Sequence, residues 1–144
     1  MARRKPKPTP PFRSHFEERI AKELDDANVE YTYEQYQLRY DEPLRKNMAR
    51  CGECGSKDLV RTGWYTPDFY LVGTGIILET KGRFTAADRR KMVNVCAQHP
   101  EERIVMLFMS DNKIHAKSTT RYSDWCMQNG IEYAVGSPHK EWLK

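Results

Sequence analysis

The sequence predicts one α/β domain in which helices flank a mixed central sheet. Its 144 residues, 39% of them hydrophobic and 31% charged, are enough for a single apolar core. Apolar residues at helical spacing recur in several segments, and short alternating or wholly apolar runs between them predict strands. The resulting order is α-β-insertion-β-β-α-β-α-β-α, without an internal repeat.

The first expected element is a helix over residues 14–28. Phe16 and Leu24 belong to one apolar stripe at helical spacing. Ser14 and Glu17 form an S-x-x-E capping box, in which the serine caps the first turn and the glutamate returns a hydrogen bond. The cap and the stripe together define where this helix begins and which side it buries.

The same rules predict the rest of the chain. Thr85, followed three residues later by Asp88, marks a helix start, and Gly130 marks a helix end. The wholly apolar run "IVMLFM" is typical of a central strand. In chain order we expect a tyrosine-rich strand over 29–40, an irregular insertion over 41–63, a hairpin over 64–82, a helix over 85–99, a central strand over 103–110, a helix over 120–130, a strand over 131–135 and a last helical turn over 137–144.

The net charge of +4 is modest, but the basic residues are clustered. Residues 1–12 contain no acid and four prolines, which predicts a disordered basic arm ahead of a single domain over 13–144. Such clusters are often only solvated surface, but they also suit contacts with the phosphates of DNA. The candidate contacts are Arg3, Arg4, Lys5, Lys7 and Arg13 of the first cluster, and Arg83, Arg89, Arg90 and Lys91 of the second.

Three observations bear on the compartment. The longest apolar run, Ile104 to Met109, is far shorter than the ~20 residues that span a membrane. The basic N-terminus has no apolar segment behind it, so no signal peptide is expected. Four cysteines, of which Cys96 and Cys126 are isolated, suit a reducing environment. We therefore expect an intracellular protein without membrane contact.

The hairpin "WYTPDFYLVGTGIILETKG" carries charges among its apolar residues. Glu79 and Lys81 are two positions apart, so their side chains leave the same face of a strand. The turn brings Asp68 toward the same patch. Two crowded carboxylates repel unless a cation lies between them, and Mg²⁺ prefers oxygen ligands. Two acids, a metal and a lysine are a minimal set of groups for phosphodiester hydrolysis.

A simpler interpretation assigns these residues to the fold alone. Glu79 and Lys81 would form an ordinary ion pair on a strand, and Asp68 would order the turn after Pro67. The basic helix that follows and the additional acid on the first helix favour the nuclease interpretation.

At this point the residues carry a family resemblance. "TPDF" followed by "ETKG" resembles the PD-(D/E)XK nuclease signature. "FRSHFEE", "YTPDF", "GIILETKG", "DRRK", "QHPE" and "EWLK", in this order, resemble the phage endonuclease I family, the Holliday-junction resolvases of T-seven-like phages. The resemblance implies a restriction-endonuclease-like core of order α-β-β-β-α-β and an intertwined, domain-exchanged homodimer. It also implies metal-dependent cleavage of four-way and other branched DNA, in the host cytoplasm.

The resemblance also assigns roles to residues. It implies that Asp68 and Glu79 bind the catalytic metal, together with the backbone carbonyl of Thr80, and that Lys81 is the catalytic lysine. Glu17 is the additional acid, contributed across the dimer to the other subunit's site. The cofactor implied is Mg²⁺ or Mn²⁺, with one or two ions in each site.

The insertion over 41–63 departs from the family pattern. Its "CGECG" has the form of a zinc knuckle, in which Cys51 and Cys54 would point two thiolates at one Zn²⁺. A structural zinc needs four ligands. The two chains of a dimer could share one site, or histidines could supply the other ligands, although none of the four lies at a characteristic spacing: His15, His99, His115 and His139. Otherwise the two cysteines are free thiols.

Two further hypotheses stay open. One is another PD-(D/E)XK nuclease that uses the same residues to cut transposon ends or nick mismatches. The other is a non-catalytic zinc-knuckle DNA-binding protein. Cleavage of junctions against linear duplexes tests the first, and divalent-metal binding tests the second.

Overall fold

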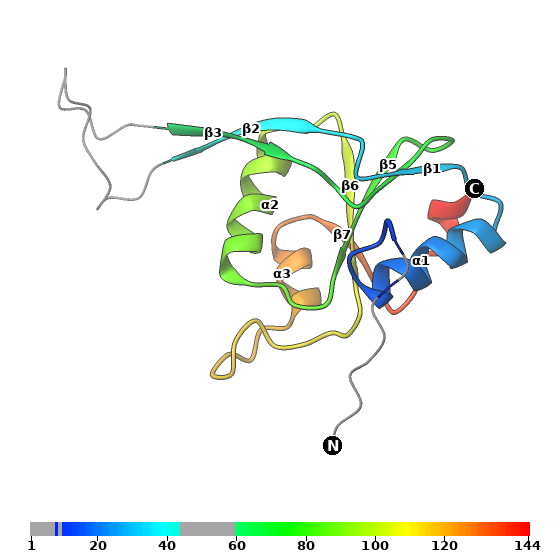
Figure 1. The fold of residues 1–144 in the computed structure, drawn as a ribbon. Coiled ribbons are helices and arrows are strands. Elements are labelled where there is room, and N and C mark those ends of the chain that lie inside the picture. Colours follow the sequence, from blue (N-terminus) through cyan, green and yellow to red (C-terminus); the bar gives the residue numbers. More distant parts are fainter. Residues whose placement is uncertain (1–7, 9, 44–59) are drawn as a thin grey trace.

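The computed structural model describes residues 8, 10–43 and 60–144. It confirms an α/β fold with a mixed central sheet flanked by helices (Figure 1). One face of the sheet is covered by α1 (His15–Asp26) and by the short 3-10 helix η1 (Lys140–Leu143). The other face is covered by α2 (Ala86–Gln98) and α3 (Tyr122–Gln128).

Five strands form the central sheet. Their spatial order is β1 (Tyr31–Tyr33), β4 (Phe69–Leu71), β5 (Ile76–Lys81), β6 (Arg103–Phe108) and β7 (Glu132–Val135). The first three are antiparallel and the last three parallel, which makes the sheet mixed. The predicted hairpin is therefore confirmed for β4 and β5, and Gly75 in its turn has the positive φ of 72° that glycine adopts without strain.

Strand alternation divides the core between the two faces. On β5, Ile76 and Leu78 pack toward α1, whereas Ile77 packs toward α2. All three side chains are fully buried, so β5 is held on both sides. This rigid strand carries the charged residues of the predicted site at its C-terminal end.

A second, two-stranded sheet corrects two predictions. β2 (Leu38–Pro43) pairs with β3 (Val60–Tyr65), so part of the segment expected to be irregular is extended. The single strand expected over 29–40 is instead divided into β1 and β2. Glu34 separates them because its backbone adopts a positive φ of 52°, which interrupts an extended chain.

Both long helices begin where the sequence predicts. The side chain of Ser14 caps α1, and Thr85 with Asp88 forms a complete capping box on α2. Gly130 follows the end of α3 with a φ of 66°. In the described part of the chain, none of the helices has the length and apolar character that crossing a membrane requires.

Candidate active site

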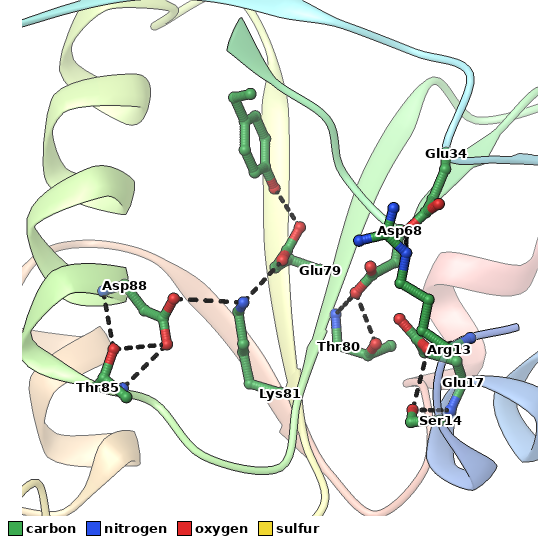
Figure 2. A network of polar contacts seen from close by, with 11 residues as sticks. Arg13, Ser14, Glu17, Glu34, Asp68, Glu79, Thr80, Lys81, Thr85 and Asp88 are labelled. Atoms are coloured by element: carbon green, nitrogen blue, oxygen red, sulfur yellow. Dashed lines mark hydrogen bonds and ion pairs between the residues drawn. The ribbon is translucent and has the colours of Figure 1, made fainter. Parts of the chain in front are cut away.

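The charged residues of the hairpin meet the starts of both long helices at the C-terminal end of β5 (Figure 2). Alternation along β5 places Glu79 and Lys81 on the α2 side, where Ile77 also packs. Thr80 lies on the α1 side and contacts Asp68. The site therefore spans both sides of one strand end.

On the α2 side, Lys81 lies between two carboxylates. Its Nζ is 3.3 Å from Oε1 of Glu79 and 3.5 Å from Oδ1 of Asp88 (Figure 2). The other oxygen of Glu79 accepts a 2.7 Å hydrogen bond from the buried hydroxyl of Tyr65 on β3. Strand phase predicted the contact between Glu79 and Lys81, and two other elements, α2 and β3, supply the remaining two contacts.

On the α1 side, Asp68 is fixed by one residue. Its Oδ2 accepts hydrogen bonds from the backbone N–H of Thr80 at 2.8 Å and from the Thr80 hydroxyl at 2.6 Å. Carboxylate oxygens of Glu17, Glu34 and Asp68 lie within 4.8 Å of one another. Figure 2 shows these three side chains gathered beside the start of α1. Glu17 therefore reaches the Asp68 of its own chain.

Glu17 also serves the cap of α1. Its Oε2 accepts hydrogen bonds from the backbone N–H of Arg13 and from the Ser14 hydroxyl, both at 3.0 Å. The capping contacts differ from those of the S-x-x-E pattern, in which the acid returns to the N-cap backbone. Both capping hydrogen bonds use Oε2 of Glu17. Oε1 is therefore free to contribute to the carboxylate cluster while Oε2 caps the helix.

Burial and mutual repulsion disturb the ionisation of the site. Burial, followed by the charge of Glu79, raises the pKa of Asp68 to about 8. Burial also raises the pKa of Glu79, although the ammonium of Lys81 opposes it. Burial lowers the pKa of Lys81, but the carboxylates of Glu79 and Asp88 outweigh this effect and raise it. The pKa shifts of Asp68 and Glu79 show that the site favours protonated carboxyls when no cation lies between them.

This donor set fits a hard divalent cation. Carboxylate oxygens of Glu17, Glu34 and Asp68 lie close enough together to hold one ion. Glu79 lies outside this group, on the other side of β5, but it is also buried, and its charge raises the pKa of Asp68, a repulsion that a cation would relieve. Oxygen ligands of this kind suit Mg²⁺ or Mn²⁺ better than the softer metals.

The predicted DNA-contact residues of the second cluster have different surroundings. Arg83 and Arg90 are exposed beside the start of α2. Arg89 turns inward and donates a 2.7 Å hydrogen bond to the carbonyl of Phe84. Lys91 lies over the ring of Tyr65, with Nζ 5.4 Å from the ring centroid. Arg83, in the loop before α2, and Arg90, on α2, thus carry the exposed guanidinium groups of this cluster.

The first cluster is only partly described. Arg13 forms a 2.9 Å ion pair with Glu34, so its guanidinium is engaged at the edge of the site. The other proposed arm residues, Arg3, Arg4, Lys5 and Lys7, and the proposed zinc ligands, Cys51 and Cys54, lie outside the described residues. Cys126 is buried and Cys96 partly buried, as expected for core residues.

Three residues escaped the sequence-based prediction. Tyr65 on β3 contacts Glu79, and Asp88 on α2 contacts Lys81. Glu34 joins the carboxylate cluster. Asp88 had a full explanation as a helix cap. Nothing local marks Glu34, because its place depends on the backbone N–H that it donates to the carbonyl of Asp68 at 3.0 Å. Only contacts between distant elements identify these residues.

Comparison with known proteins agrees with the resemblance. The model of the family described as phage endonuclease I matches residues 59–144. The chain is 32% identical over 134 residues to Endonuclease I of Escherichia phage T7, covering 92% of this chain and 78% of that protein. It is 33% identical over 124 residues to Endodeoxyribonuclease 1 of Enterobacteria phage T3, covering 85% of this chain and 70% of that protein. The chain belongs to the phage endonuclease I family.

Proposed function

We propose that the protein is a metal-dependent endodeoxyribonuclease that cuts branched DNA, including four-way Holliday junctions. The buried pair of Asp68 and Glu79, with Lys81 beside it, is the observation that carries this proposal. The relatives from phages T7 and T3, named as an endonuclease and an endodeoxyribonuclease, support it. A phage enzyme of this kind acts in the host cytoplasm.

The roles in this proposal are those that the family resemblance implies, and the buried carboxylates of the site support them. Asp68 and Glu79 would hold one or two Mg²⁺ or Mn²⁺ ions with the carbonyl of Thr80, and Glu17 would complete the ligand set. When bound, the cation polarises a phosphate oxygen and lowers the pKa of water. Water adds to phosphorus, one phosphorus–oxygen bond to a sugar breaks, and the departing oxygen takes up a proton. The ammonium of Lys81 orients the water or balances charge on the phosphate.

Branched DNA is the substrate that a two-fold dimer would suit. Two sites related by symmetry cut two strands of a junction at equivalent positions. Recognition then rests on the shape of the junction and on its phosphates, which exposed Arg83 and Arg90 are placed to contact. We extend the proposal to an intertwined, domain-exchanged homodimer.

If the chains exchange halves, the pairing between β2 and β3 would form between the two chains. β2 pairs with β3 in register from Leu38 with Tyr65 to Pro43 with Val60. In an exchanged dimer the same pairs form between two chains, and the α1 side of each site comes from the partner. Light scattering of the purified protein measures the molar mass. Mixing Glu17→Gln with Glu79→Gln subunits tests the exchange, because mixed dimers regain one intact site only if the two residues act across chains.

The first experiment is cleavage of a synthetic four-way junction in Mg²⁺, beside a linear duplex built from the same arms. Wild type, Glu79→Gln and Glu17→Gln are compared. Paired cuts near the branch point, lost in both variants, are expected. Equal cutting of both substrates would indicate a nuclease of different specificity, and binding without cutting would indicate a recognition module. Zinc analysis of wild type against Cys51→Ser tests the proposed knuckle.

A further inference from the structure

The two carboxylate oxygens of Asp88 have different partners. Oδ2 accepts hydrogen bonds from the backbone N–H of Thr85 at 3.0 Å and from its hydroxyl at 2.9 Å, which closes the capping box. Oδ1 lies 3.5 Å from Nζ of Lys81. Figure 2 shows Asp88 between its helix cap and the lysine. One side chain therefore contributes to the start of α2 and to the candidate active site.

Through Oδ1, Asp88 is a second carboxylate that interacts with the Lys81 ammonium, beside Glu79. Glu79 Oε1, the nearer acceptor at 3.3 Å, belongs to a proposed metal ligand. An ammonium that paired with Glu79 alone would compete with a divalent cation for the same oxygen, because both are attracted to its negative charge. A second carboxylate on the opposite side holds the ammonium away from full pairing with the metal ligand.

We propose that Asp88 is a positioning residue for catalysis, which holds Lys81 toward α2 and so keeps Glu79 available to the divalent cation. This inference rests on the proposed nuclease function. The backbone N–H of Thr85 holds Oδ2 of Asp88 at 3.0 Å, and this hydrogen bond does not depend on the Thr85 side chain. Because α2 also presents Arg90 and Lys91, the same helix links the DNA-facing surface to the lysine.

The unequal use of the two oxygens allows a clean substitution. In Asp88→Asn the amide oxygen can take the place of Oδ2 and keep both cap hydrogen bonds. The amide nitrogen then faces Lys81, and as a donor it cannot accept from the ammonium. Asp88→Glu retains a carboxylate, and a T-x-x-E sequence still forms a capping box. Thr85→Val is the matched control, because it removes the cap hydroxyl and leaves Asp88 charged.

The test measures thermal stability, junction binding in Ca²⁺, and the single-turnover cleavage rate over a range of Mg²⁺ concentrations. Asp88→Asn is expected to melt and bind like wild type, to cut about tenfold to a hundredfold more slowly, and to need more Mg²⁺ for half-maximal rate. Asp88→Glu should recover most of the rate. Thr85→Val should melt at a lower temperature and retain the wild-type rate and Mg²⁺ requirement.

Three outcomes would overturn the proposal. The first is an Asp88→Asn enzyme with the wild-type rate and Mg²⁺ requirement. The second is a parallel loss of rate and melting temperature in Asp88→Asn and Thr85→Val, because Asp88 would then act through the cap alone. The third is a wild type that binds the junction and never cuts it. In that case the nuclease function itself fails, and the wild-type arm of the same assay distinguishes this from failure of Asp88 alone.

Discussion

Replacing Asp68 by asparagine should stabilise the metal-free protein at alkaline pH. Burial and the charge of Glu79 raise the pKa of Asp68 from 3.8 to about 8. The folded state therefore holds a proton that the unfolded state has released between these two values. Because this proton stays bound only in the folded state, its contribution to the free energy of unfolding is highest below about pH 4 and falls as the pH rises to about 8. Asparagine has no charge to bury at any pH.

The magnitude follows from the shift. A change of about 4 units at 1.36 kcal/mol each gives a ceiling of about 5 kcal/mol at pH 8. The substitution should preserve the fold, since an amide oxygen can accept both hydrogen bonds from Thr80. Half of the ceiling would raise the melting temperature by roughly 5–10 °C for a domain of this size. Near pH 4.5 most of this difference should vanish.

Thermal melts in EDTA at pH 4.5, 6 and 8 measure this effect. Asp26→Asn is the control, because it removes the same charge from an exposed position at the end of α1. Adding Mg²⁺ at pH 8 should stabilise wild type, since a ligand that binds only the folded state raises its stability, and should stabilise Asp68→Asn less. An Asp68→Asn protein that melts below wild type at pH 8 in EDTA would refute the reasoning, because Asp68 would then be a stabilising charge.

Three more predictions concern separate parts of the molecule. Glu79→Gln should abolish cleavage, retain junction binding in gel shifts, and leave the metal-free melting temperature equal or higher; severe destabilisation would instead favour the simple ion pair with Lys81. Arg90→Gln should reduce the slope of log affinity against log salt by about one unit, measured by fluorescence anisotropy, and an unchanged slope would remove this residue from the DNA surface. Arg103→Gln should cost about 0.5–1 kcal/mol in urea unfolding, because Arg103 pairs with exposed Glu132 through two 2.9 Å hydrogen bonds, and a cost of several kcal/mol would contradict a surface role.

Local signals explain why most of the fold was predictable. The cap at Thr85, the glycine-bearing turn before β5 and the apolar run of β6 each act within a few residues. The sequence therefore predicts where these elements begin and end. The pairing of β2 with β3 depends on contacts between residues that are more than 20 positions apart along most of the ladder. Polar residues and an insertion do not reveal such a register, so the second sheet was missed.

The break between β1 and β2 illustrates the same limit at one residue. Glu34 takes a positive φ although glycine or asparagine would be the usual choice there. Its N–H donates to the carbonyl of Asp68, and its carboxylate pairs with Arg13. The conformation is maintained by partners from two other segments. A rule that uses only neighbouring residues predicts an uninterrupted strand at this position.

The alternation of side chains along β5 was enough to predict part of the candidate site. A two-residue period places Glu79 and Lys81 together, and the hairpin brings Asp68 to the same strand end. The same period places Thr80 on the opposite side, so the predicted patch is divided between both faces of β5. The groups that surround it, Tyr65 among them, come from elements whose packing no local pattern encodes.

Glu17 and Asp88 show why a motif with a sufficient structural explanation can conceal a second role. Each is the third residue of a helix that begins beside the site, and each gives one oxygen to the cap. Acids at this position are favoured by the positive end of the helix dipole, which also makes such helix starts suited to anionic sites. A capping box predicts the first oxygen's partner only. The partner of the second oxygen depends on what lies across from the helix start, which is the carboxylate of Asp68 for Glu17 and the ammonium of Lys81 for Asp88.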